Sequence, residues 1–528
     1  MSDTKSISFL SVLSRLEDSL RAGAGSLEKD ELSRLIKNIN QSISETVKND
    51  FLKKAPGISH NWETIFEAVI LNHLEKRLAE TLNVDMYLSF GRYLLEYAER
   101  SDTALVMLIQ NYLDIYRQPA FLMRIEEMAS WEKLILDLID KSNFHVGQLV
   151  KQRIRDYPDK VIFRLLNNDR DELYNWKKTA KLIDMYAHGI GKFAAGERNE
   201  TGKVAFLMEN SIDMILLDLA CLTSGIVNVM IPANSVAGHV EFILNQTRAS
   251  VVLVSNEKQL AKIKSIKKNL TVLNYAVMLE GDSIEPWVLS FDDLKKESAN
   301  FSDDLLRQRQ KKIHIDDLAT IMYTSGTTGD PKGIMFSHKN LIYKRFCRAM
   351  ALPEIGDEDR FLAYLPLYHT FGRWLEMLGS VFWGAEYVFM ENPAISTMVD
   401  NMQRCKPTIF ISIPKKWYEL YEKIRSEVDI ELAEDEVILE RVKQITGGKL
   451  RWGLSAAGYL EPDVFTFFQR NGIELMSGFG MTEATGGITM TPPTKYIENS
   501  LGTALPGIEL KLAEDGELLI RGDYVMMG

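Results

Sequence analysis

Apolar residues in the first 145 positions recur at intervals of three and four, which is the spacing of an amphipathic helix. The segments with this spacing are residues 9–20, 32–43, 65–78 and 105–115. Strand alternation is scarce in the same part of the chain. The pattern predicts an all-helical accessory domain over residues 1–145. Packing against the main body or a partner is the simple interpretation of its role, and regulation or docking on a membrane is the alternative.

From about residue 148 the pattern changes to short apolar runs that alternate with helical stretches. Residues 204–208 and 251–255 are rich in side chains that favour strands. Each run adjoins a predicted helix, over residues 211–223 and 240–247. Alternation of this kind predicts parallel sheets covered by helices, and therefore an α/β fold class.

The last 28 residues change pattern again. Apolar and polar positions alternate over residues 508–512 and 517–521, on either side of Glu514-Asp515-Gly516. Two alternating runs around such a turn predict a β-hairpin. We therefore predict α/β subdomains over residues 146–500 and the start of a small β-subdomain over residues 501–528.

Charge and cysteine content narrow the function classes. The chain has 62 Lys and Arg against 73 Asp and Glu, for a net charge of −11. Nucleic acid is not an expected partner, because its binders normally present a basic face. Three widely separated cysteines without a CxxC pair indicate neither a disulfide framework nor a zinc site, so a cytoplasmic location is expected. The most apolar stretch, residues 214–232, is interrupted by Asp218 and Asn228 and falls short of a membrane span. Peripheral membrane contact remains an alternative, and the oligomeric state is left open.

A short apolar strand over residues 321–323 leads into a loop rich in glycine and hydroxyl groups. The loop contains Thr324, Ser325, Gly326, Thr327, Thr328, Gly329, Asp330, Pro331, Lys332 and Gly333. Glycines let the backbone approach an anion closely, and the hydroxyl and ammonium groups add donors to the same loop. It is not a P-loop, since only two residues separate Gly326 from Gly329 and a glycine follows Lys332. We predict a polyphosphate site in which Lys332 neutralises charge.

This loop resembles the phosphate-binding signature of the AMP-binding, or acyl-adenylate-forming, superfamily. Three further blocks follow in the family's order, so the resemblance extends over about residues 148–528. It implies the large domain of an adenylate-forming enzyme, with layered αβαβα subdomains and a small β-subdomain, preceded here by the helical domain. The ATP phosphates would be bound by Thr324, Ser325, Gly326, Thr327, Thr328, Gly329 and Lys332.

Two of the blocks concern the acyl group and the adenine. Residues 364–372 resemble the block whose histidine lies near the acyl substrate, which implies a functional role for His369. The alternative is a histidine that only packs in the core. Residues 454–459 resemble the family segment whose backbone lies beside the adenine. This resemblance implies that Ala457, Gly458 and Tyr459 contact the adenine. The family usually has proline at the position of Tyr459, so this turn departs from the pattern.

The last block lies at residues 477–483, and the resemblance places Ser477, Gly478, Phe479 and Gly480 at the adenine. Phe479 replaces a common tyrosine, which keeps an aromatic face for stacking and loses a hydroxyl. Thr482 is expected to meet the phosphates. Glu483 is expected to bind Mg²⁺, which commonly takes a carboxylate together with phosphate oxygens. With Lys332 and His369, these two residues are the catalytic candidates.

The resemblance implies ATP- and Mg²⁺-dependent activation of a carboxylic acid, followed by thioester formation with CoA. Residues 413–424 resemble a Pro-x-x-Trp-Glu segment of long-chain acyl-CoA synthetases, although Tyr418 separates Trp417 from Glu419. This segment favours a long-chain fatty acid as substrate. The alternatives are a fatty-acyl-AMP ligase that serves a carrier protein and a non-catalytic protein that binds nucleotide or acts as a scaffold.

In the resembled family, a Thr-Gly-Asp, a hinge and a C-terminal lid domain with a catalytic lysine follow the position of Gly528. None of these can be assigned in this sequence. We therefore expect a chain truncated before the lid domain, with low activity on its own. A natural short form is the alternative.

Overall fold

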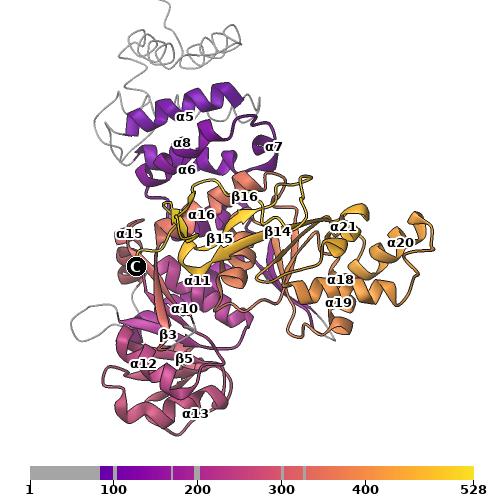
Figure 1. The fold of residues 1–528 in the computed structure, drawn as a ribbon. Coiled ribbons are helices and arrows are strands. Elements are labelled where there is room, and N and C mark those ends of the chain that lie inside the picture. The colour runs from indigo at the N-terminus through magenta and orange to yellow at the C-terminus, as the bar shows by residue number, and fades with distance from the viewer. Residues whose placement is uncertain (1–83, 99–103, 168–170, 195–201, 299–302, 325–328) are drawn as a thin grey trace, which may run out of the picture. The chain divides into compact units, whose positions relative to one another are not determined.

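The computed structural model describes residues 84–98, 104–167, 171–194, 202–298, 303–324 and 329–528 (Figure 1). The chain divides into two compact units, Met1–Phe144 and His145–Gly528. The predicted helices within residues 9–78 lie outside the described residues and stay predictions. The division into domains at residues 145 and 500 likewise stays a prediction.

The described part of the first unit is helical. Its helices are α5 (Val84–Ala98), α6 (Ala104–Tyr116), α7 (Pro119–Leu122) and α8 (Ala129–Lys141). Helix α6 confirms the helical spacing seen over residues 105–115. The rings of Tyr87 and Tyr112 stack with centroids 4.2 Å apart, and each hydroxyl donates to the other residue's carbonyl oxygen. These reciprocal bonds join α5 to α6.

The second unit contains a seven-stranded sheet in the order β7-β6-β5-β3-β4-β8-β9, parallel except between β8 and β9. Its strands are β3 (Lys203–Leu207), β4 (Asn228–Ile231), β5 (Ala249–Val254), β6 (Tyr275–Met278), β7 (Val288–Ser290), β8 (Leu318–Thr324) and β9 (Lys332–Ser337). The helices of this part are α9 (Val146–Asp156), α10 (Trp176–Ala194), α11 (Ile212–Ser224), α12 (Ala237–Thr247), α13 (Glu257–Ile266), α14 (Phe291–Glu297) and α15 (Asp303–Lys312). Strands β3 and β5 and helices α11 and α12 confirm the predicted alternation.

A nine-stranded sheet has the order β16-β15-β14-β13-β12-β10-β11-β1-β2 and is parallel from β14 to β1. Its strands are β1 (Val161–Leu165), β2 (Glu172–Asn175), β10 (Arg360–Ala363), β11 (Glu386–Phe389), β12 (Ile409–Ser412), β13 (Trp452–Ala456), β14 (Glu474–Met481), β15 (Gly486–Met490) and β16 (Thr503–Ala504). Its helices are α16 (His338–Ala351), the π-helix η3 (Phe371–Met377), α17 (Leu378–Trp383), α18 (Ile395–Cys405), α19 (Pro414–Arg425), α20 (Asp435–Thr446) and α21 (Pro462–Arg470).

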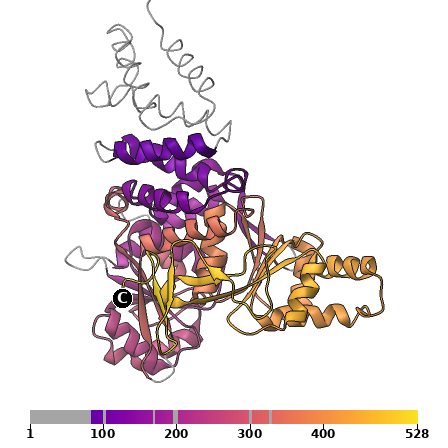
Figure 2. The same cartoon turned by 45° about the horizontal axis from the view of Figure 1, so that its top comes forward.

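The helices of the two sheets form separate groups within the second unit. Helices α12 and α13 pack on each other and contact strands β4, β5 and β6, whereas α18, α19, α20 and α21 pack together beside the second sheet. Figures 1 and 2 show the same separation from two directions. The predicted hairpin is confirmed as the antiparallel pair β17 (Glu509–Leu512) and β18 (Leu518–Arg521).

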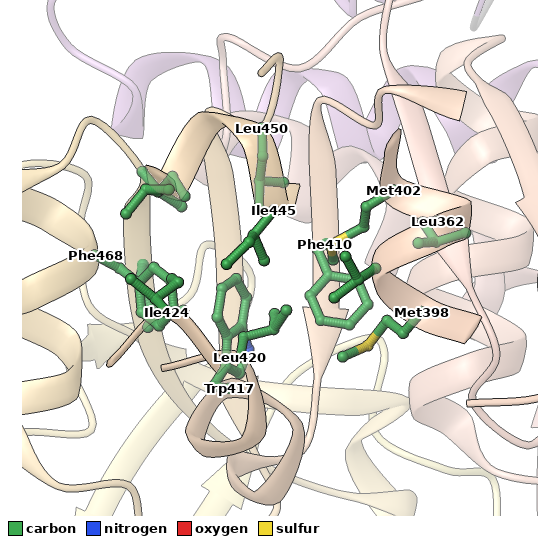
Figure 3. Packing of buried hydrophobic residues seen from close by; sticks show 14 of the residues in the cluster. Leu362, Met398, Met402, Phe410, Trp417, Leu420, Ile424, Ile445, Leu450 and Phe468 are labelled. Carbon is green, nitrogen blue, oxygen red and sulfur yellow. The ribbon is translucent and has the colours of Figure 1, made fainter. Parts of the chain in front are cut away.

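The second sheet is held to its helices by a core around Trp417 (Figure 3). Its indole is fully buried and lies 5.2 Å from the ring of Phe410 and 5.1 Å from that of Phe468, measured between centroids. Its Nε1 donates to the carbonyl oxygen of Leu454, 3.2 Å away. A Cβ on Gly453 would lie 2.5 Å from the indole, so only glycine fits there. Trp417 therefore anchors α19 on β13.

Replacing Trp417 with alanine should lower the free energy of unfolding by about 3–5 kcal/mol, because it opens a cavity in this core. Urea unfolding followed by circular dichroism measures the change. The matched control is Tyr418→Ala on the same helix, whose side chain is 45% exposed and should cost less than about 1 kcal/mol. Equal losses from the two variants would contradict the anchoring role.

Candidate functional site

The ends of the glycine-rich loop are set by the hairpin of β8 and β9. Thr324 ends β8 and lies directly opposite Lys332, the first residue of β9. Lys332 is exposed and Thr324 is half-buried, so the ammonium group is open to a ligand above the hairpin. Residues 325–328 lie outside the described residues, and their predicted phosphate contacts stay predictions.

A cavity of about 620 Å³ lies beside strands β13 and β14. It brings together most of the residues predicted to face the nucleotide: Ala457, Gly458, Tyr459, Ser477, Gly478, Phe479, Gly480 and Thr482. The side chains of Phe479 and Tyr459 keep 38% and 69% of their surface exposed. Two aromatic faces are thus available at the cavity mouth for a flat ring. Lys332, His369 and Glu483 are not among the lining residues.

Glycine shapes the wall that β14 and β15 form. Gly480 pairs with Gly487, and a Cβ on Gly480 would lie 2.3 Å from the carbonyl oxygen of Gly486. Any side chain at Gly480 would therefore push the two strands apart. The close approach lets the turn after β14 point Thr482 into the cavity.

Glu483 is fixed by backbone contacts with residues near the end of the described chain. Its carbonyl oxygen accepts a hydrogen bond from the backbone N–H of Met526 at 2.7 Å. Met527 and Gly528 in turn exchange backbone hydrogen bonds of 2.9 Å with Met335 on β9. The turn that carries Glu483 is thus tied to the strand that begins with Lys332.

His369 lies in the loop between β10 and the π-helix η3. Its side chain is exposed on one side, while the burial of its ring lowers the pKa of the imidazole below its ordinary value. The imidazole is therefore neutral at pH 7 and can act as a hydrogen-bonding group. The two residues that follow it, Thr370 and Phe371, line the cavity.

The sequence profile of the family described as AMP-binding enzyme matches residues 150–528. The chain belongs to this family. Its large α/β unit, with two sheets and helices between and around them, has the fold expected for an adenylate-forming enzyme.

Curated relatives within the AMP-binding family carry names of fatty-acid ligases. The chain is 24% identical over 420 residues to the long-chain-fatty-acid–CoA ligase FadD15 of Mycobacterium bovis, covering 73% of this chain and 68% of that protein. It is 26% identical over 381 residues to long-chain-fatty-acid–CoA ligase 5 of Rattus norvegicus, covering 62% of this chain and 54% of that protein. The chain thus spans between about half and two thirds of the length of these relatives.

Solved structures of the family have the same fold. The anthranilate CoA ligase AuaEII in complex with anthranoyl-AMP superimposes with a TM-score of 0.58 at 22% identity, over 73% of this chain and 71% of that one. The long-chain-fatty-acid–CoA ligase FadD1 from Archaeoglobus fulgidus gives a TM-score of 0.60 at 20% identity, over 73% and 76%. Within the described ranges, no helix of this AMP-binding enzyme is long and apolar enough to span a bilayer.

Asn210, which was not among the residues predicted from the sequence, positions the loop before His369. Its amide oxygen accepts the N–H of Leu367 at 2.9 Å, and its amide nitrogen donates to the carbonyl oxygens of Leu365 and Tyr364 at 2.8 and 3.2 Å. A single asparagine between β3 and α11 thus satisfies three backbone groups of the loop. An asparagine three residues after the end of a buried strand was the available signal.

Arg373 on the π-helix was likewise not predicted from the sequence, and its side chain is fully buried. Its guanidinium donates to both carboxylate oxygens of Asp218 at 2.8 and 2.6 Å, to Asn228 Oδ1 at 3.0 Å and to Thr320 Oγ1 at 2.9 Å. These partners lie on α11, β4 and β8. The π-helix at the cavity is therefore bonded to three elements of the seven-stranded sheet. The cavity is also lined by Arg345 and Arg348 of α16, which the sequence gave no reason to select.

Replacing Arg373 with methionine should lower the free energy of unfolding by about 3–5 kcal/mol, because it leaves the Asp218 carboxylate buried without its cation. Urea denaturation at pH 7 measures this loss. Arg404→Met is the control: its exposed guanidinium pairs with Asp171, and such surface pairs contribute about 0–1 kcal/mol. The interpretation fails if both variants unfold at the same urea concentration.

Proposed function

We propose that this chain binds ATP and activates a fatty acid as its acyl-adenylate, with CoA as the acceptor in a second step. The observation that carries the proposal is a cavity of about 620 Å³, whose lining joins the adenine-type segments to an apolar wall. That wall includes Leu375, Leu454, Leu460 and Phe465. A flat polar base and an alkyl chain would both find suitable surfaces there.

The charged candidates fit the phosphate end of such a ligand. Lys332 is exposed above the β8–β9 hairpin and would neutralise phosphate oxygens. Glu483 is half-buried beside Thr482. Mg²⁺ usually takes one or two carboxylates and completes its shell with phosphates and water, so a lone carboxylate next to a hydroxyl fits this ion. When bound, Mg²⁺ would supply charge stabilisation to the triphosphate.

The chemistry that these groups would support is positioning and charge neutralisation. A carboxylate oxygen of the acid forms a bond to the α-phosphorus of ATP, and the bond from that phosphorus to the bridging oxygen breaks. Pyrophosphate leaves with the two electrons of the broken phosphorus–oxygen bond. In the second step a thiolate attacks the acyl carbon, the carbon–oxygen bond to AMP breaks, and AMP departs. Lys332 would hold the departing pyrophosphate, and neutral His369 would orient the acid by hydrogen bonding.

A long-chain fatty acid is the proposed substrate, on two grounds. Trp417 of the resembled Pro-x-x-Trp segment donates to the carbonyl oxygen of Leu454, a residue of the cavity wall. The matched relatives from Mycobacterium bovis and Rattus norvegicus are both named long-chain-fatty-acid–CoA ligases. The segment would therefore shape the cavity from behind without touching the acid.

Pyrophosphate release with acids from acetate to hexadecanoate, with and without CoA, tests the function. Release that peaks at long acids and yields acyl-CoA supports the proposal. Acyl-AMP without acyl-CoA would instead favour a ligase that serves a carrier protein. Saturable ATP binding with no pyrophosphate release from any acid would favour a non-catalytic nucleotide-binding protein.

Glu483→Gln should weaken the binding of ATP in the presence of Mg²⁺ by about tenfold to a hundredfold. The reason is that the substitution removes the negative charge of the carboxylate that would bind the metal ion. Displacement of a fluorescent ATP analogue gives the affinity. In EDTA the variant and the unmodified chain should bind ATP equally, because no metal is present to be held.

Glu514→Gln is the control for this experiment. Glu514 is an exposed glutamate in the turn between β17 and β18, and its replacement should leave both affinities unchanged. A Glu483→Gln variant that loses ATP affinity equally with Mg²⁺ and with EDTA would remove the metal role from this residue.

A further inference from the structure

Helix α16 places two arginines inside the cavity described above. Arg345 and Arg348 line it, and they are only 2% and 3% exposed. Lys344 lies next to them in sequence, is fully buried, donates to the carbonyl oxygen of Gly487 and sits 3.7 Å over the ring of Tyr524. Three buried basic side chains thus occur within five positions of one helix.

Among the residues that the structure describes, the two arginines have no anionic partner. Arg345 donates through Nη1 to the carbonyl oxygen of Trp374, and Arg348 Nη1 lies 3.4 Å from Met490 Sδ. The Nε atoms of both are buried with no acceptor. Across the described part of the chain, no carboxylate lies within ion-pair distance of either guanidinium. Each guanidinium offers five N–H groups, so most of this donor capacity is unused.

Burial of unpaired charge is costly, and the cost is not relieved by loss of the proton. Burial first, and then the repulsion from Arg348, lower the pKa of Arg345 to about 9. Burial also lowers the pKa of Arg348 to about 10. Both side chains are therefore cationic at pH 7. Arg373 differs from these two arginines in having an anionic partner: it is also buried, but its guanidinium donates two hydrogen bonds to the carboxylate of Asp218.

Arg348 and Lys332 lie on different elements, helix α16 and strand β9. A Cβ on Gly487 would lie 2.2 Å from its Nη2, so the guanidinium lies against the backbone of β15. Arg345 contacts Trp374 within the π-helix. Lys332, by contrast, is exposed above the β8–β9 hairpin and is not a lining residue. Arg345 and Arg348 are buried residues of the same cavity wall as Leu375, which is the wall that we assign to the acyl part of a substrate.

We propose that the acid activated by this chain carries a second oxyanion, in the first instance a second carboxylate, and that Arg345 and Arg348 bind it. The proposal rests on the proposed function for the identity of the reaction. A carboxylate matches the planar donor fork of a guanidinium and supplies the missing counter-charge. The remaining wall of Leu454, Leu460 and Phe465 would contact the alkyl chain between the two acid groups.

Thermal unfolding with added acids tests the site without requiring turnover. The probes are hexadecanedioate, hexadecanoate and the monomethyl ester of hexadecanedioic acid, which keeps the length of the diacid and removes one charge. We expect the diacid to raise the melting temperature and to bind at least tenfold more tightly than the other two. Equal binding of all three acids would overturn the proposal.

The variants are Arg345→Met, Arg348→Met and Arg348→Lys, with Arg441→Met as the control for loss of an exposed arginine. Without ligand, each methionine variant should melt at or above the temperature of the unmodified chain, because a buried unpaired charge is replaced by an apolar group. Each should lose the preference for the diacid, and Arg348→Lys should retain part of it. Methionine variants that melt lower than the unmodified chain and keep the preference would show a structural role for the arginines.

Three further outcomes separate this proposal from its rivals. Methionine variants that lose ATP affinity, measured with the fluorescent analogue, would assign the arginines to the nucleotide phosphates and overturn the proposal. A diacid preference in binding, abolished by the variants but without pyrophosphate release from any acid, would support the anion site and refute adenylation. Pyrophosphate release faster with hexadecanoate than with the diacid would retain adenylation and refute the anion site.

Discussion

The structure of the cavity depends on one buried ion pair, between Arg373 and Asp218. Arg373 belongs to the π-helix, whose residues Phe371 and Leu375 line the cavity, and Asp218 belongs to α11 beside the other sheet. Hydrogen bonds to Asn228 and Thr320 complete the coordination of the guanidinium. A buried charge with all its partners in place has one low-energy arrangement, so it fixes the π-helix in position. The backbone N–H of Arg373 also donates to the carbonyl oxygen of His369 at 2.9 Å, at the end of the loop that Asn210 positions.

Close packing around glycine residues shapes the side of the cavity that strands β13, β14 and β15 form. Gly480 lies against Gly486 with no room for a side chain, and Gly453 lies against the indole of Trp417. At both positions the neighbouring atoms lie so close that a side chain of even one methyl group would clash with them, so glycine is required. The wall that faces the nucleotide in our proposal is therefore rigid backbone, with Phe479 as an exposed side chain on it.

The two kinds of buried arginine in this unit differ in what they do for stability. Arg373 has its counter-charge within the chain, whereas Arg345 and Arg348 have none among the described residues. Unpaired buried charge lowers the stability of the folded chain. Such unfavourable charges are found mainly at functional sites, where a bound ligand supplies the missing partner. The distribution of buried charge thus distinguishes the scaffold of the cavity from the part that we propose binds substrate.

The sequence by itself determined the α/β alternation, the hairpin of β17 and β18, and the blocks around Lys332, His369 and Glu483, because periodicity and short motifs are local properties. Their roles remain proposals, and the helices expected before residue 84 remain predictions. Only the tertiary structure decided the burial of charge. Asp218 and Arg373 lie 155 positions apart, and nothing in the local sequence of α16 indicates that Arg345 and Arg348 are buried. Whether a buried charge has a partner depends on side chains from segments far away in the sequence. A local sequence pattern does not show which of those segments will pack against it.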